Sequence, residues 1–140
     1  MIFKTILSLL SVGAAGVFLT SSCILLNPRH NKPICLESSF VIQERTKQNK
    51  ISEGWGSISG NVVNVLFERP LSYGEVYIKG AEANYTTVDS LGFFSLQTFA
   101  GTHTLGVIGI SNDTIFSDSI ELLSQESIII QVNFGCCYIE

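Results

Sequence analysis

Charged side chains are scarce in this sequence, at 14% of the residues, where soluble proteins usually carry about 25%. Acids outnumber bases and give a formal net charge of -4. The bases are concentrated before residue 51, and from Ile51 onward only Arg69 and Lys79 oppose a strongly acidic stretch. An acidic domain repels phosphate backbones, so this composition excludes nucleic acid as a partner.

The sequence also lacks the patterns that usually mark catalytic and metal sites. There is no G-x-S-x-G segment, no series of carboxylates with EF-hand spacing, and no paired Cys/His spacing of a zinc site. Of the two histidines, His103 begins an expected strand, and we assign it a structural role. The sequence therefore predicts a protein that is not an enzyme, with no cofactor and no metal.

The first 26 residues have the layout of an export signal. Lys4 is followed by an apolar stretch from Ile6 to Leu19, then by the small residues Thr20 to Ser22, and then by Cys23. This order is typical of a secretory signal peptide. An uncleaved membrane anchor is an alternative, because Ile6 to Leu26 is about 20 largely apolar residues, close to a membrane thickness. Either way, the rest of the chain is expected outside the cytoplasm.

A cysteine directly after the small residues resembles the lipobox of bacterial lipoproteins. In that family the cysteine is acylated and becomes the first residue of the mature protein. The usual box has Leu three positions before the cysteine, whereas Thr20 stands there in this chain and Leu19 one position earlier. The resemblance implies a signal peptide over residues 1–22 and a lipid on Cys23. The expected location is the cell envelope, preferably the outer membrane. A plain secretory signal with an incidental Cys23 is the alternative.

Residues 23–54 are polar and basic and are predicted to form a tether. Pro28 and Pro33 interrupt regular structure there. We prefer a solvated linker to one whose bases lie against anionic lipid. The apolar residues Phe40 to Ile42 either add an edge strand or pack on the folded domain.

Residues 55–140 carry short β-rich runs, spaced by about ten residues and separated by turn residues. Apolar and polar residues alternate in several of these runs, and no apolar stripe of helical period follows Ile51. This pattern predicts an all-β fold, a seven-stranded antiparallel β-sandwich. The expected strands are 57–66, 73–79, 85–89, 93–98, 102–110, 114–122 and 127–134.

Three segments of this region, in order, carry a family resemblance. They are Ile58-Ser59-Gly60-Asn61-Val62, Gly74 to Gly80, and Thr86-Thr87-Val88-Asp89-Ser90-Leu91-Gly92-Phe93-Phe94-Ser95-Leu96. Together they resemble a carboxypeptidase regulatory-like domain over Ile58 to Leu122, with Phe99 and His103 departing from the usual Pro and Tyr. The resemblance implies a transthyretin-like (prealbumin-like) sandwich. This module is found attached to peptidases, uptake receptors and lipoproteins, so the resemblance implies scaffolding and interaction and not chemistry.

Several residues between Ile58 and Leu122, including Pro70 of the segment Arg69-Pro70-Leu71, have predicted structural roles. Pro70 fixes a turn, Gly92 allows a positive φ, and Asp89 can accept backbone N–H groups across the tight turn. Phe94 and Leu96 are expected in the core, whereas Phe93 is out of phase with them.

Four cysteines are present, and three of them remain if Cys23 carries a lipid. Cys35, Cys136 and Cys137 would then lie in an oxidising compartment, which allows one disulfide and one leftover thiol. A vicinal bridge is strained, so we expect Cys35 to pair with either Cys136 or Cys137.

The sequence thus favours a non-catalytic lipoprotein module that binds or scaffolds a protein or glycan partner and contacts the membrane through its lipid. One alternative is a small envelope enzyme, or a thiol- or metal-active protein, using Cys136, Cys137 or His103. Another is a structural subunit that docks through an exposed sheet edge.

Overall fold

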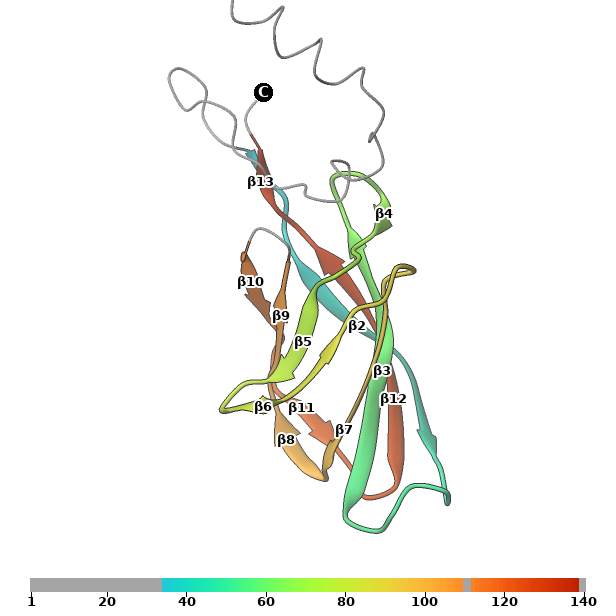
Figure 1. Cartoon of the computed structure of the whole chain (residues 1–140). Coiled ribbons are helices and arrows are strands. Elements are labelled where there is room, and N and C mark those ends of the chain that lie inside the picture. Colours follow the sequence, from blue (N-terminus) through green and yellow to red (C-terminus); the bar gives the residue numbers. More distant parts are fainter. Residues whose placement is uncertain (1–33, 110–111, 139–140) are drawn as a thin grey trace, which may run out of the picture.

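The computed structural model describes residues 34–109 and 112–138 (Figure 1). Within these residues the protein is all-β, and no helix is long and apolar enough to cross a bilayer. The strands are β1 (Ile34–Cys35), β2 (Ser39–Lys47), β3 (Trp55–Asn64), β4 (Arg69–Pro70), β5 (Glu75–Ile78), β6 (Ala81–Thr87), β7 (Phe93–Phe99), β8 (Gly101–His103), β9 (Leu105–Ile108), β10 (Thr114–Phe116), β11 (Ile120–Leu122), β12 (Glu126–Phe134) and β13 (Cys137–Tyr138).

The larger sheet is built around β12. Its strand order is β2-β12-β3-β4, and β7 also pairs with β3. β12 is antiparallel to β2 but parallel to β3, so the expectation of purely antiparallel sheets was wrong. The apolar residues Ile128 to Ile130, followed by Val132, indicate a largely buried strand. Alternation within a strand, however, carries no information about the direction of its neighbours.

β2 is the main departure from the expected domain boundary at residue 55. The nine residues Ser39–Lys47 lie in the larger sheet, although residues 23–54 were expected to form a tether. An edge strand needs only one apolar face, which Phe40 and Ile42 supply by pairing opposite Val132 and Ile130. A register shift follows Ile42, so the apolar alternation ends there and the strand resembles a polar linker in sequence.

The second layer contains the sheet β10-β9-β5-β6, and β8 and β11 form a separate pair. The expected strands 102–110 and 114–122 are therefore each divided in two, and the described residues hold thirteen strands in place of seven. Ser117 explains the break between β10 and β11. Its hydroxyl accepts the N–H of Leu105 at 2.9 Å and donates to the carbonyl of Asp118 at 2.7 Å.

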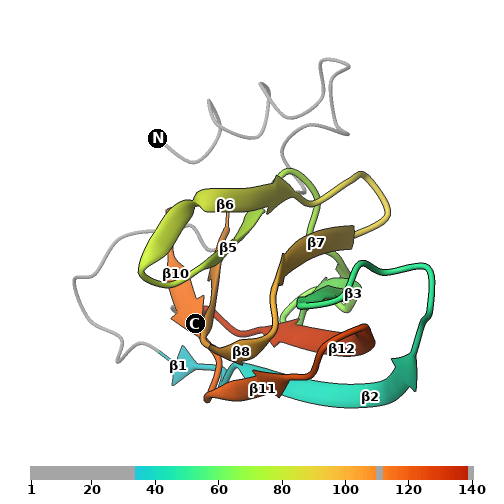
Figure 2. The ribbon, with the colours of Figure 1, turned by 90° about the horizontal axis from the view of Figure 1, so that it is seen from below.

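One apolar core lies between the two layers, an arrangement consistent with a β-sandwich (Figure 2). Phe94, Phe134 and Leu105 are among its largest fully buried side chains. In β7 every second side chain is buried, so Phe94 is 1% exposed while its neighbour Phe93 is 45% exposed. The larger sheet contributes Ile58, Val62, Phe94, Leu96, Ile128, Ile130, Val132 and Phe134 to the core, and the second layer contributes Val76, Ile78, Leu105 and Val107.

The turn before β7 is held by Asp89. One oxygen of its carboxylate accepts the N–H groups of Leu91 and Phe93, each at 2.9 Å. Gly92 has φ +80°, and a Cβ placed there would lie 2.6 Å from the carbonyl oxygen of Val62 and 2.9 Å from Cβ of Pro70. The turn therefore packs directly on β3 and β4 and requires glycine at this position.

Candidate functional site

A cleft of about 430 Å³ opens at one edge of the sandwich, between β2 and the corner that joins β10 to β11. Phe40 and Ile42 of β2 and Ile130 of β12 line one side, and Phe116 and Ile120 line the other. The remaining lining residues are polar: Ser38, Ser39, Ser117, Asp118 and Ser119. The lining is thus half apolar and half polar, and the volume falls within the range of ligand sites, about 300–1,000 Å³.

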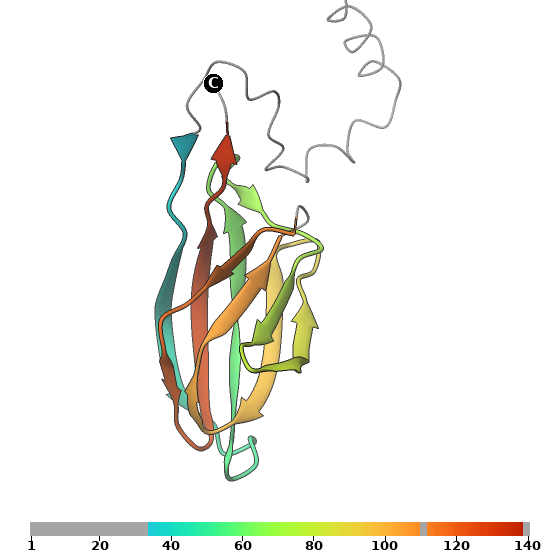
Figure 3. The same ribbon diagram turned by 90° about the vertical axis from the view of Figure 1, so that its left-hand side faces the viewer.

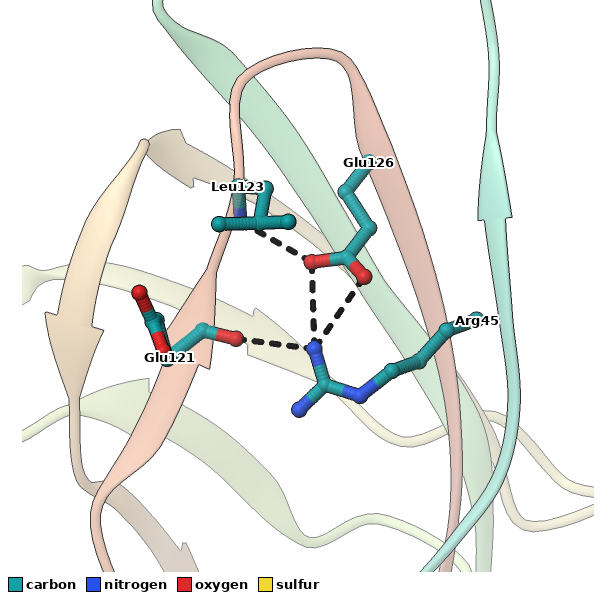
Figure 4. Close-up of polar contacts among 4 residues, drawn as sticks. All are labelled: Arg45, Glu121, Leu123 and Glu126. Carbon is teal, nitrogen blue, oxygen red and sulfur yellow. Dashed lines mark hydrogen bonds and ion pairs between the residues drawn. The ribbon is translucent and has the colours of Figure 1, made fainter.

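A polar clamp closes the sandwich next to this cleft (Figure 4). Nη1 of Arg45, on β2, lies 3.1 Å from both carboxylate oxygens of Glu126 and 3.0 Å from the carbonyl oxygen of Glu121. The Glu126 carboxylate, which is nearly buried, also accepts the N–H of Leu123 at 2.9 Å. These bonds connect the edge strand β2 to β11. The side chains of Arg45 and Glu126 therefore occupy the space between the two layers on the C-terminal side of Ile42.

β2 itself presents an unpaired edge. It pairs with β12 on one side, and no other described strand pairs with it (Figure 3). Two neighbouring apolar residues on it are exposed to a similar degree, Val41 at 49% and Ile42 at 40%. Ile42 faces the cleft, while Val41 pairs with Gln131 and faces the outside of the sheet. The structure therefore places an open strand edge and a cleft of mixed apolar and polar lining side by side.

The outer face of the larger sheet is a second exposed surface. Its outward positions on β7, β3 and β12 are uncharged, and β2 adds Glu44. Trp55 and Phe99 lie at one end of this face, with ring centroids 4.1 Å apart. The positions that form the face are Phe93, Ser95, Gln97, Phe99, Trp55, Ser57, Ser59, Asn61, Val63, Ser127, Ile129, Gln131 and Asn133.

The candidate residues for chemistry do not come together in the described part of the chain. His103 lies at the end of β8, where Nε2 donates a hydrogen bond to the carbonyl of Phe99 at 2.7 Å. The Asp89 carboxylate already accepts hydrogen bonds in the turn before β7, whereas His103 follows β7 in the sequence. Residues 34–109 and 112–138 contain no group of three or more His, Cys, Asp or Glu side chains placed to hold a metal ion.

The cysteines of the described residues differ in their bonding state. Cys35 is disulfide-bonded, and Cys136 is a free, buried thiol, so Cys136 is not its partner. In the antiparallel pair of β1 and β13, Cys35 lies directly opposite Cys137. Residues directly opposite in such a pair have Cα atoms about 4.5–5.5 Å apart, within the range that a disulfide spans. Cys23 lies outside the described residues, so its lipidation stays a prediction.

Sequence reasoning missed the cleft and the Arg45 clamp. Phe40 to Ile42 was the only signal for β2, and nothing in the sequence paired Arg45 with Glu126, which lies 81 positions away. No protein-family model matches this chain, and no curated protein matches it. The resemblance to a carboxypeptidase regulatory-like domain therefore stays a prediction from the motifs alone.

Proposed function

We propose that this protein is a non-catalytic, lipid-anchored module of a bacterial cell envelope that binds a protein partner at the edge of its sandwich. The cleft beside the free edge of β2 is the observation that carries the proposal. It offers apolar surface, polar rim groups and unpaired backbone in one place, which are the elements of a recognition site. The transthyretin-like type of the sandwich is part of the proposal and rests on the motif series from Ile58 to Leu122.

Photo-crosslinking in intact cells tests the binding site. A photoreactive amino acid at position 42 should capture a defined protein more efficiently than the same group at position 41, because Ile42 faces the cleft and Val41 faces the outer side of the sheet. The captured protein should no longer be retained by an Ile42→Glu variant in detergent extracts. Equal capture from both positions would contradict a partner seated in the cleft.

The anchor is tested separately at Cys23. Cys23→Ser should leave the protein unprocessed or release it from the membrane fraction, because the thiol is the acceptor of the lipid. Intact-mass analysis of the wild-type protein extracted from membranes should show cleavage before Cys23 and the added mass of acyl chains. Normal cleavage with unchanged membrane retention in Cys23→Ser would remove the lipoprotein assignment.

A neutral glycan is a second candidate ligand, favoured by the outer face of the larger sheet. Pyranose rings stack on exposed aromatic rings, and their hydroxyl groups pair with Ser, Asn and Gln side chains. Phe99 is exposed beside Trp55 at one end of this almost uncharged face. Affinity electrophoresis in neutral polysaccharides should retard the wild-type protein and not Phe99→Ala. Tyr85→Ala is the matched control, because Tyr85 is an exposed aromatic side chain on β6 of the second layer, away from this face and from the cleft.

The thiol- or metal-active alternative fits the structure less well. The free thiol of Cys136 is buried, and Nε2 of His103 is already bonded. Thiol titration of the folded protein should therefore show no rapidly reacting group at Cys136, since a reactive cysteine needs an accessible thiolate.

A further inference from the structure

We infer that the partner binds by adding an extended peptide strand to the free edge of β2, with two of its alternate side chains in the cleft. This inference rests on the proposed function and specifies how the partner is held. The occupant is a segment of another protein in which apolar residues alternate with polar ones.

The backbone of β2 supplies the first element of the site. A strand at a sheet edge presents a row of unpaired N–H and C=O groups, and proteins usually cover or disrupt such a row. No described strand pairs with the outer edge of β2, and the strand is nine residues long, longer than most edge strands. An incoming peptide would satisfy these groups with main-chain hydrogen bonds, as in other cases of strand addition.

The cleft supplies the second element. Side chains alternate between the two faces of a strand, so every second residue of an added strand faces the same side as Phe40 and Ile42. That side is the opening of the cleft, whose far wall is formed by Phe116 and Ile120. The Arg45 clamp fills the interlayer space immediately after the register shift. Apolar side chains of the peptide are therefore accommodated only beside Ser39–Ile42, which limits them to two.

Charge defines the direction and the ends of the peptide. Near the start of β2, Asp118 lines the cleft and Glu37 is exposed, and no base lies between Glu37 and Glu44. At the other end, β2 finishes at Lys47, and the following loop carries Lys50 and Glu53. A peptide with a basic residue beside Asp118 and an acidic residue beside Lys47 complements both ends, so its charge order fixes its orientation along β2.

The test uses the full chain in mild detergent and synthetic peptides. The probe is a capped nine-residue peptide of alternating threonine and apolar residues, with lysine at one end and glutamate at the other. Three comparisons follow: the same peptide in both charge orders, one with N-methyl groups on alternate amides, and one interrupted by proline. Fluorescence anisotropy of a labelled peptide measures binding, and hydrogen exchange of residues 39–47 reports pairing.

The expected results are specific. Binding should slow exchange of the β2 amides, one charge order should bind roughly tenfold more tightly than the other, and proline should abolish binding. Methylation of the amides that face β2 should abolish binding, whereas methylation of the alternate set should not. Ile42→Glu should weaken binding roughly tenfold or more, while Val41→Glu, which places its charge beside the solvent-facing threonines of the added strand, should weaken it much less.

Two results would overturn the inference. Binding that is insensitive to N-methylation and gives no exchange protection in β2 would exclude strand addition, and this outcome does not depend on any variant folding. A concentration-dependent dimer that protects β2 without peptide would make a second copy of this chain the occupant. If position 42 still captures a cellular partner in either case, the proposed function stands without this binding mode; if no partner is captured, the proposed function itself fails.

Discussion

Phe94 and Phe93 are adjacent residues of the same type on opposite faces of β7, so they test the register of the core directly. Phe94 is 1% exposed in the core, whereas Phe93 is 45% exposed on the outer face. Truncation of a buried Phe to Ala costs about 3–5 kcal/mol, because apolar burial is lost and a cavity remains. Exposed substitutions usually change stability by about 0.5 kcal/mol or less. Phe94→Ala is therefore expected to be several times more damaging than Phe93→Ala.

Urea unfolding of the full chain in mild detergent measures the difference. Trp55, the only tryptophan of the chain, reports on the fold because it stacks on Phe99 where β3 meets β7. A loss of about 4 kcal/mol, divided by a slope of about 2 kcal/mol per molar urea, lowers the midpoint by roughly 2 M. Phe93→Ala should lower it by only a few tenths of a molar unit. Equal shifts, or a larger shift for Phe93→Ala, would refute the assignment of the two faces of β7.

Three further predictions follow from individual contacts. Gly92→Ala should lower the free energy of unfolding by about 2–4 kcal/mol, because the alanine must keep a positive φ and its Cβ collides with the carbonyl oxygen of Val62. Gly80→Ala is the control: it also has a positive φ, +85°, but no neighbour within 4 Å, so thermal unfolding should show a cost of only about 1–2 kcal/mol. Arg45→Met should destabilise by about 1–3 kcal/mol, because the nearly buried Glu126 carboxylate loses its charged donor, and Glu126→Gln combined with it should recover part of the loss; no recovery would argue against a coupled pair. Non-reducing peptide mapping should recover Cys35 linked to Cys137 with Cys136 as a thiol, and a Cys35–Cys136 peptide would contradict the strand register.

Local patterns in the sequence located much of the larger sheet. The alternation of Phe94 and Leu96 with Phe93 placed β7, and the apolar run from Ile128 placed β12, each within one residue of the observed start. The turn before β7 was also identifiable, because Asp89 and Gly92 have distinct requirements for hydrogen bonding and backbone angle. These features depend on neighbours in the sequence, so the sequence alone carries them.

Features that depend on distant residues were not predictable. Phe40 to Ile42 offered an edge strand as one of two alternatives, but the polar residues after them look like a linker. Only the pairing with β12 shows that the strand continues to Lys47. The divisions at Thr104 and Ser117 arise where the chain passes between sheets, and continuous β-propensity hides them. The cleft exists because β2 and the β10–β11 corner lie opposite each other, and these segments are more than 70 residues apart.

The parallel pairing of β12 with β3 has a consequence for the order of folding. β12 lies between β2 and β3, although it is synthesised after both and after every strand of the second layer. Until residue 134 has been made, β2 and β3 have no strand between them, and both expose edges that other chains can pair with. Long-range pairing of this kind also slows folding, because the loop between the strands must close first. Correct folding therefore requires that β2 and β3 do not pair with other chains before β12 has been synthesised. A chain that ends before Glu126 lacks the strand that joins β2 to β3 and cannot complete the larger sheet.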